Sequence, residues 1–122
     1  MNTTTRLTEA DLNQFTGSEH WYRHALNPKV LFTDGAKYVA DEGGAYWLLD
    51  IIALAQRYDK RVAATPFQVW KLSVRRDCTA TLVCEDGDYN RVTVQELEYT
   101  DFPAAEVTLW FADTVIYLPS EH

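Results

Sequence analysis

The stretch WKLSVRRDCTATLVC, residues 70–84, alternates apolar and polar side chains on both sides of a short polar turn. The alternating apolar positions are Trp70, Leu72 and Val74 before the turn and Ala80, Leu82 and Cys84 after it. A period of two is typical of strands that bury one face. The turn, residues 75–78, is short enough for a hairpin. The stretch therefore predicts two antiparallel strands.

The same period continues toward the C-terminus. Val92 and Val94 predict a third strand after the turn at residues 85–88, and Val107, Leu109 and Phe111 predict a fourth. A fifth follows at residues 115–118. The apolar phase slips by one residue between Val94 and Leu97, which predicts a bulge near residues 95–96. Five strands in a meander are expected, and one face of their sheet has a solvated pattern: Lys71, Ser73, Thr79, Thr81, Thr93 and Gln95.

The N-terminal half has a different pattern. Residues 45–58 have the length and the apolar face of a helix that packs on a sheet. Residues 30–33 and 37–40 are β-prone and flank Asp34-Gly35, which favours a hairpin. Thr8 resembles a helix N-cap, and it predicts a short helix that ends at Gly17. The fold class expected is α+β. An antiparallel sheet of about five strands plus an N-terminal hairpin is packed on one face by one main helix, in a single domain over residues 1–122.

The negative charge is concentrated at one end of the chain. The 122 residues carry a net charge of −7. Beyond Arg76 the only cation is Arg91, against ten carboxylates: Asp77, Glu85, Asp86, Asp88, Glu96, Glu98, Asp101, Glu106, Asp113 and Glu121. Such a field repels nucleic acid and attracts basic proteins, although a negative balance also serves solubility alone. We expect no direct binding of nucleic acid.

Two further features concern location. The N-terminus lacks the apolar core of a signal peptide, and the longest apolar stretch, residues 45–55, contains Asp50 and is too short to span a bilayer. The spacing of Cys78 and Cys84 is not that of metal ligands, so we expect both to be reduced thiols. We therefore expect a cytoplasmic protein without membrane contact.

Three groups of residues could carry chemistry. His20 and His24 have the spacing of two metal ligands on a helix, but no third ligand lies near them. Arg75 and Arg76 could activate Cys78, whereas Cys84 reads as a buried side chain. Helical projection places Asp50 beside Tyr46, Ala53 and Arg57, on the solvated face of its helix. We predict no metal site, no cofactor and no catalytic residue.

Eight blocks along the chain together resemble an uncharacterised family of small proteins encoded on plasmids, phages and other mobile elements of bacteria. The matching blocks are residues 15–17, 21–24, 33–38, 44–50, 67–70, 84–87, 98–103 and 118–121. The resemblance supplies a genetic setting and no active site. Accessory proteins from that setting often bind a host protein to inhibit or modulate it.

The leading hypothesis is a non-catalytic acidic protein that docks on a basic host protein and inhibits or modulates it. Nucleic-acid-binding proteins and defence components are two classes of host target that this hypothesis includes. Its predicted binding residues are Glu85, Asp86, Asp88, Glu96, Glu98, Asp101 and Trp110. One alternative is a small enzyme with a site in an aromatic and basic cluster: His20, Trp21, Tyr22, Arg23 and His24. Another is a structural protein, a homo-oligomer that pairs through an edge strand at residues 115–118.

Overall fold

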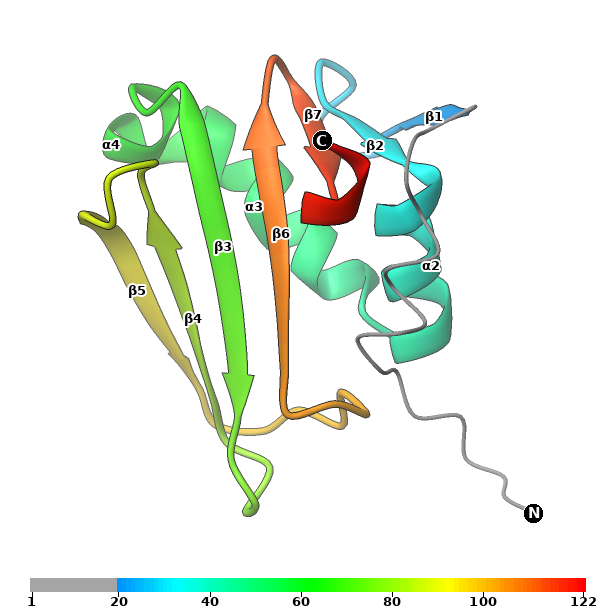
Figure 1. The fold of residues 1–122 in the computed structure, drawn as a ribbon, viewed down its shortest axis with the longest axis vertical. Coiled ribbons are helices and arrows are strands. Elements are labelled where there is room, and N and C mark those ends of the chain that lie inside the picture. The colour runs from blue at the N-terminus through cyan, green and yellow to red at the C-terminus, as the bar shows by residue number, and fades with distance from the viewer. Residues whose placement is uncertain (1–19) are drawn as a thin grey trace.

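The computed structural model describes residues 20–122, which form an α+β structure in which one sheet is backed by helices (Figure 1). In chain order the elements are β1 (Trp21–Arg23), β2 (Leu31–Thr33), α2 (Asp34–Gly43), α3 (Tyr46–Tyr58), α4 (Lys60–Ala63), β3 (Phe67–Val74), β4 (Ala80–Glu85), β5 (Arg91–Leu97), β6 (Glu106–Ala112), β7 (Val115–Tyr117) and the 3₁₀ helix η1 (Pro119–Glu121). The short helix predicted from Thr8 to Gly17 lies outside the described residues.

Within residues 20–122 the sheet has seven strands in the order β1-β2-β7-β6-β3-β4-β5. All neighbours are antiparallel except β2 and β7, which are parallel. The prediction of a purely antiparallel sheet was therefore wrong. The meander was wrong as well, because β6 pairs with β3 and leaves β5 at the edge. Residues 115–118 contain β7, which lies between β2 and β6 and is not an edge strand as predicted.

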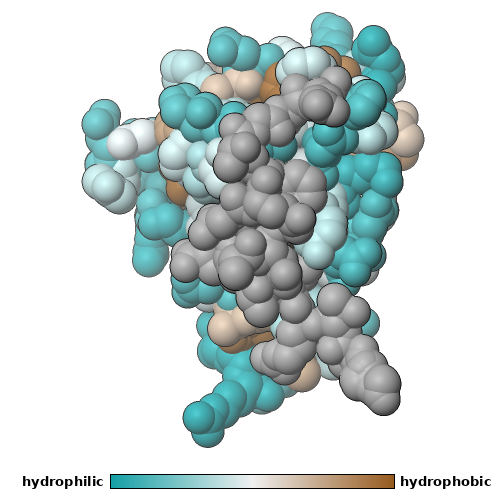
Figure 2. Space-filling model, turned by 45° about the vertical axis from the view of Figure 1, so that its right-hand side comes forward, coloured by the Kyte–Doolittle hydropathy of each residue, from teal (hydrophilic) through white to brown (hydrophobic). Residues whose placement is uncertain are grey.

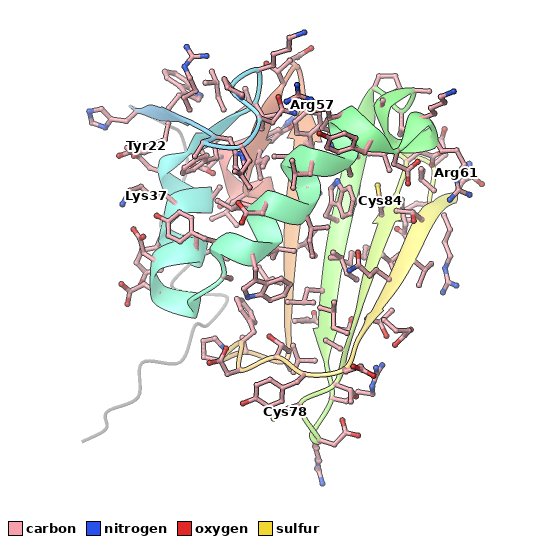
Figure 3. The ribbon with its side chains drawn as sticks, turned by 180° about the vertical axis from the view of Figure 1, so that it is seen from behind. Tyr22, Lys37, Arg57, Arg61, Cys78 and Cys84 are labelled. Carbon is pink, nitrogen blue, oxygen red and sulfur yellow. The ribbon has the colours of Figure 1, made fainter. Side chains whose placement is uncertain are left out.

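The helices α2, α3 and α4 all lie on one face of the sheet (Figures 1 and 3). Leu48, Leu49 and Ile52 of α3 are almost wholly buried, as are Leu72 and Leu82 of the sheet. Burial of such side chains is the main force that holds the two layers together. The helix predicted at residues 45–58 is confirmed as α3. The opposite face of the sheet, away from α2, α3 and α4, is called the open face.

A helix stands where the second half of the N-terminal hairpin was predicted. Residues 37–40 belong to α2, and only residues 31–33 form a strand. Thr33 caps the helix, since its side chain accepts a hydrogen bond from the Ala36 backbone N–H at 3.3 Å. Ala36, Val39 and Ala40 form its buried stripe. The hairpin signal of Asp34-Gly35 was overridden by this cap and by burial of that stripe.

Apolar alternation correctly identified the helix-covered face in β3, β4 and β6, but not in β5. In β5, Val94 pairs with Val83 on the open face and is 43% exposed. Thr93 and Gln95 instead pair with Cys84 and Leu82 on the helix-covered side. They line a 270 Å³ hollow beside α3, so polar residues are tolerated there. The register shift lies at Cys84 and Glu85, not at residues 95–96 as predicted.

Candidate functional site

A groove of about 810 Å³ lies on the open face. Its floor is formed by Phe67 and Val69 of β3 and by Trp110 of β6. The register places Val69 opposite Trp110, while the next residue of β3, Trp70, points to the helices and is buried. The turn between β4 and β5 borders the groove on one side and η1 on the other (Figure 1). A cavity of this size is within the range of ligand-binding sites.

An aromatic cluster stabilises this floor. The ring of Trp110 meets the rings of Phe67, Tyr117 and His122 edge to face, with centroid distances of 5.2, 6.0 and 5.3 Å. Edge-to-face contacts of this kind are favourable and fix the orientation of the rings. Trp110, one of the predicted binding residues, therefore lies in a preformed apolar surface.

The groove is acidic. Among the described residues, its lining contains three carboxylates, Glu85, Asp86 and Glu106, and one ammonium group, that of Lys71. Lys71 Nζ lies 3.0 Å from Glu85 Oε1, so the cation is already engaged within the protein. The same ammonium group stands 5.9 Å from the centre of the Tyr89 ring. The geometry is that of a cation held between a carboxylate and an aromatic face.

The turn that borders the groove is held by Asp86. Its carboxylate accepts hydrogen bonds from the backbone N–H groups of Asp88 and Asn90 and from the Asn90 side chain. The Asn90 hydrogen bonds are the largest cause of a lowered pKa for Asp86, so this carboxylate stays ionised. Tyr89, in the same turn, has a φ of 67°, a left-handed conformation that is costly for a bulky residue.

The six predicted acidic residues do not form one surface. Glu85, Asp86 and Asp88 lie at the β4–β5 turn, beside the groove that also contains Trp110. Glu96 lies toward the other end of β5, opposite Thr81, where its carboxylate is 3.0 Å from Arg75. Glu98 and Asp101 follow in the connection after β5 and are exposed. The structure therefore places only two of the six, Glu85 and Asp86, in the lining of the groove.

The aromatic and basic cluster is divided in the same way. Tyr22 stacks on Phe32 at a centroid distance of 5.6 Å, while Trp21 is 56% exposed. Arg23 donates a hydrogen bond to the Pro28 carbonyl. His20 lies 3.6 Å from Asp34. The sheet pairing of residues 21–23 rules out the helix that would bring His20 and His24 together.

Contrary to prediction, Asp50 is not simply solvated. It is only partly exposed, and its carboxylate accepts a hydrogen bond from Nε2 of the buried His24 at 2.8 Å. Nδ1 of His24 accepts backbone hydrogen bonds from Leu26 and Asn27, each at 3.1 Å. Both ring nitrogens are therefore engaged and the tautomer is fixed. This pair anchors the loop before β2 and offers no free nitrogen for proton transfer.

The loop covers the same side of α3 at a second point. The Asn27 side chain donates a hydrogen bond to the Ala53 carbonyl at 2.8 Å, and Ala53 is fully buried. Projection of α3 alone had placed Ala53 on the solvated face. Ala53 is buried because residues 24–30 return across the helix, and helical periodicity alone does not reveal such a contact.

The two cysteines lie apart, with Cys84 behind the helices and Cys78 at the lower end of the sheet (Figure 3). Burial is the largest cause that raises the pKa of the Cys84 thiol to about 12. A thiol of this kind is a poor nucleophile. Within residues 20–122 no group of three or more His, Cys, Asp or Glu is placed to hold a metal ion. No described helix is long and apolar enough to cross a membrane.

Sequence reasoning missed several groove residues. Phe67 and Tyr89 were not singled out, and neither were Glu106 and Pro119. A signal for Phe67 and Val69 was present, because two apolar residues alternate with the core set at the start of β3. No local signal could place η1 beside β6, since that arrangement depends on contacts between distant segments.

Comparison with known proteins gives one result. A model of a family of unknown function (DUF6876) matches residues 6–122. No curated protein and no solved structure matches the chain. The family match agrees with the resemblance to an uncharacterised family, and because it covers nearly all of the sequence, the chain belongs to this family of unknown function, DUF6876.

Proposed function

We propose that this protein is a non-catalytic acidic binding protein, and that its groove accepts a basic segment of a partner protein. The observation that carries the proposal is the composition of the groove. Among the described residues, three carboxylates surround an aromatic floor, and the one lining ammonium group, that of Lys71, is paired with Glu85. In the mobile-element setting that the sequence suggests, the partner is a host protein that is inhibited or modulated by occupation of a basic site.

The chemistry of the groove suits such a partner. Aromatic side chains in preformed hollows contribute most of the binding energy at many protein interfaces, and Trp is enriched among them. Unpaired carboxylates at the margin speed the approach of a basic surface and select against acidic ones. Asp86 and Glu106 serve this purpose, because no described cation pairs with them within 4.0 Å.

The proposal is tested by affinity capture from a host lysate, followed by binding assays with the purified partner. We compare the wild-type protein with Glu106→Lys, which places a positive charge at the groove. The matched control is Glu98→Lys, which makes the same change at an exposed position that does not line the groove. We expect Glu106→Lys to lose a basic partner that the wild type and Glu98→Lys both retain.

The salt dependence provides an independent readout. Raised salt should release the partner, because the attraction between exposed charges is screened over about 8 Å at physiological ionic strength. Equal retention by Glu106→Lys and Glu98→Lys would place the interface elsewhere and overturn the proposal for the groove. Capture of an acidic partner would contradict the charge argument.

A further inference from the structure

Strand β7 covers only part of β6. Three residues of β7 pair with Trp110, Phe111 and Ala112. On its other side β6 pairs with β3 along its whole length, from Glu106 to Ala112. Within the described residues, residues 106–109 therefore have a strand on one side only. Figure 1 shows β6 continuing well below the end of β7. We call the free side of residues 106–109 the β6 half-edge.

The alternation of hydrogen bonds shows which backbone groups face this half-edge. Ala105 accepts a hydrogen bond from the Val74 N–H at 2.7 Å, so odd-numbered residues here bond toward β3. Ala112 and Val115 close a two-residue hairpin, so even-numbered residues bond toward β7. The N–H and C=O groups of Glu106 and Thr108 consequently point to the half-edge.

The residues that carry these backbone groups line the groove. Glu106, Val107 and Thr108 all contribute to its wall, and no hydrogen bond from the Glu106 or Thr108 backbone to another described residue occurs on that side. A free strand edge is a template for one more strand, because backbone donors and acceptors need partners.

The end of β7 has an identifiable cause. Pro119 has no backbone N–H to extend a ladder, and it begins η1. Glu121 then ties the chain to α2: its carboxylate accepts hydrogen bonds from the Thr33 hydroxyl at 2.7 Å and from the Gly35 N–H at 3.1 Å. Residues 119–121 are therefore held near α2 and do not continue β7 alongside residues 106–109.

We infer that the groove takes an extended segment of the partner, which adds as a strand to the β6 half-edge where β7 stops. This inference rests on the proposed function and specifies the form of the ligand. Four residues of strand span about 13 Å, so the paired part of the segment is short. Main-chain hydrogen bonds supply affinity in this mode of recognition, and side-chain positions supply specificity.

The two sides of the half-edge favour different side chains. On the helix-covered side, Phe102, Val107 and Leu118 provide an apolar wall. On the open face, Glu106 lies opposite Ser73 and provides a negative charge. Side chains of a strand alternate between faces, so the matching segment alternates cationic and apolar residues.

The probe is a synthetic peptide, acetyl-KVRVKV-amide, followed by NMR of the protein amides at up to about 1 mM peptide, where even weak specific complexes are half filled. We expect saturable shifts of the Glu106 and Thr108 amides. Two control peptides have the same sequence with N-methyl groups on alternate residues, one at the odd positions and one at the even positions. The methyl groups remove the backbone N–H donors at those positions. We expect the peptide whose N-methyl groups face β6 to bind at least tenfold more weakly than the unmodified peptide.

Two protein variants provide the matched comparison. Thr108→Pro removes an N–H that faces the half-edge and not β3, whereas Thr108→Val keeps it. We expect binding to be lost in the first and kept in the second. If Thr108→Pro does not fold, the N-methylated peptides still decide the question from the ligand side.

Three results would overturn strand addition. One is the absence of shifts at the highest peptide concentration, and another is equal binding of all the peptides. The third is strong hydrogen-exchange protection of Thr108 in the free protein, which would mean that another part of the chain fills the place. The capture experiment with Glu106→Lys judges the proposed function separately, so an acidic groove that binds a basic partner without strand pairing would be recognised.

Discussion

At the scale of the residue, Gln68 is the most connected buried polar side chain of the structure as described. It is 1% exposed, and its amide group bonds to the Gln56 amide, to the Val62 and Thr65 carbonyls and to the Trp70 indole. It thereby ties α3 and the end of α4 to β3. Full satisfaction of this kind is what makes a buried amide tolerable in a core.

We predict that Gln68→Met lowers the free energy of unfolding by about 3 kcal/mol, because several buried partners lose their hydrogen bonds while the volume stays similar. Urea denaturation followed by tryptophan fluorescence measures the change. The control, Gln56→Met, alters a partly exposed residue of the same type and should cost less than half as much. Equal costs would mean that the network is not centred on Gln68.

Cys84 makes a prediction about pH. Its folded pKa is raised from 9.0 to about 12, chiefly by burial, which disfavours the thiolate. A raised folded pKa means that the unfolded chain loses this proton first. The contribution of the buried Cys84 thiol to the free energy of unfolding is therefore complete below pH 9 and is lost as the pH rises toward 12. Cys84→Ala should show a shallower fall in unfolding free energy across this window than the wild type, and an identical slope would contradict the burial argument.

At the scale of the element, the sequence predicted those parts whose cause is local. The helix α3 and the strands β3, β4 and β6 follow from apolar periodicity, since one face of each meets the core. The phase of β5 could not be predicted in this way, because an edge strand beside a hollow can turn polar residues inward and a valine outward. The α2 helix had a local signal in Thr33, but the Asp34-Gly35 pair gave a competing one.

The glycine in that pair has a non-local explanation. A Cβ atom at Gly35 would lie 2.5 Å from Glu121 Oε1 and 2.7 Å from Leu118 Cδ1. Real Cβ contacts are not this short, so a side chain at residue 35 would displace the Glu121 and Leu118 side chains that pack against α2. Residue 35 is separated from residue 121 by most of the chain, and no pattern within the helix reports the contact.

We predict that Gly35→Ala lowers the free energy of unfolding by about 2 kcal/mol. The sign is the opposite of the gain of about 1 kcal/mol expected when alanine replaces glycine in an ordinary helix. Urea denaturation of Gly35→Ala, Glu121→Ala and the double variant tests this, and the double variant should cost less than the sum. Glu42→Ala, an exposed change in the same helix, is the control. A stabilising Gly35→Ala would contradict the close approach.

At the scale of the whole molecule, the candidate site shows what a charge count cannot supply. The sequence has ten carboxylates after Arg76, which suggested one acidic surface. The structure separates them, because an antiparallel pair puts Glu85 opposite Arg91 and Glu96 opposite Thr81 at the other end of β5. The groove itself needs β6 to return beside β3 and η1 to lie near both. Trp110 was predicted from its residue type, whereas the apolar alternation at Phe67 did not reveal that this residue lies beside Trp110 in the floor of the groove.

This separation predicts that charge and aromatic contact affect different rate constants of partner binding. Distant carboxylates act through the field of the whole molecule, so Glu98→Lys should lower the association rate constant by about twofold at low salt and leave dissociation unchanged. Trp110→Ala removes a contact made only in the complex, so it should raise the dissociation rate constant about tenfold or more and leave association nearly unchanged. Surface plasmon resonance with the captured partner, at two salt concentrations, measures both constants, and circular dichroism checks that each variant is folded. If Trp110→Ala changed only association, Trp110 would not contact the partner, and the groove floor would not be the binding surface.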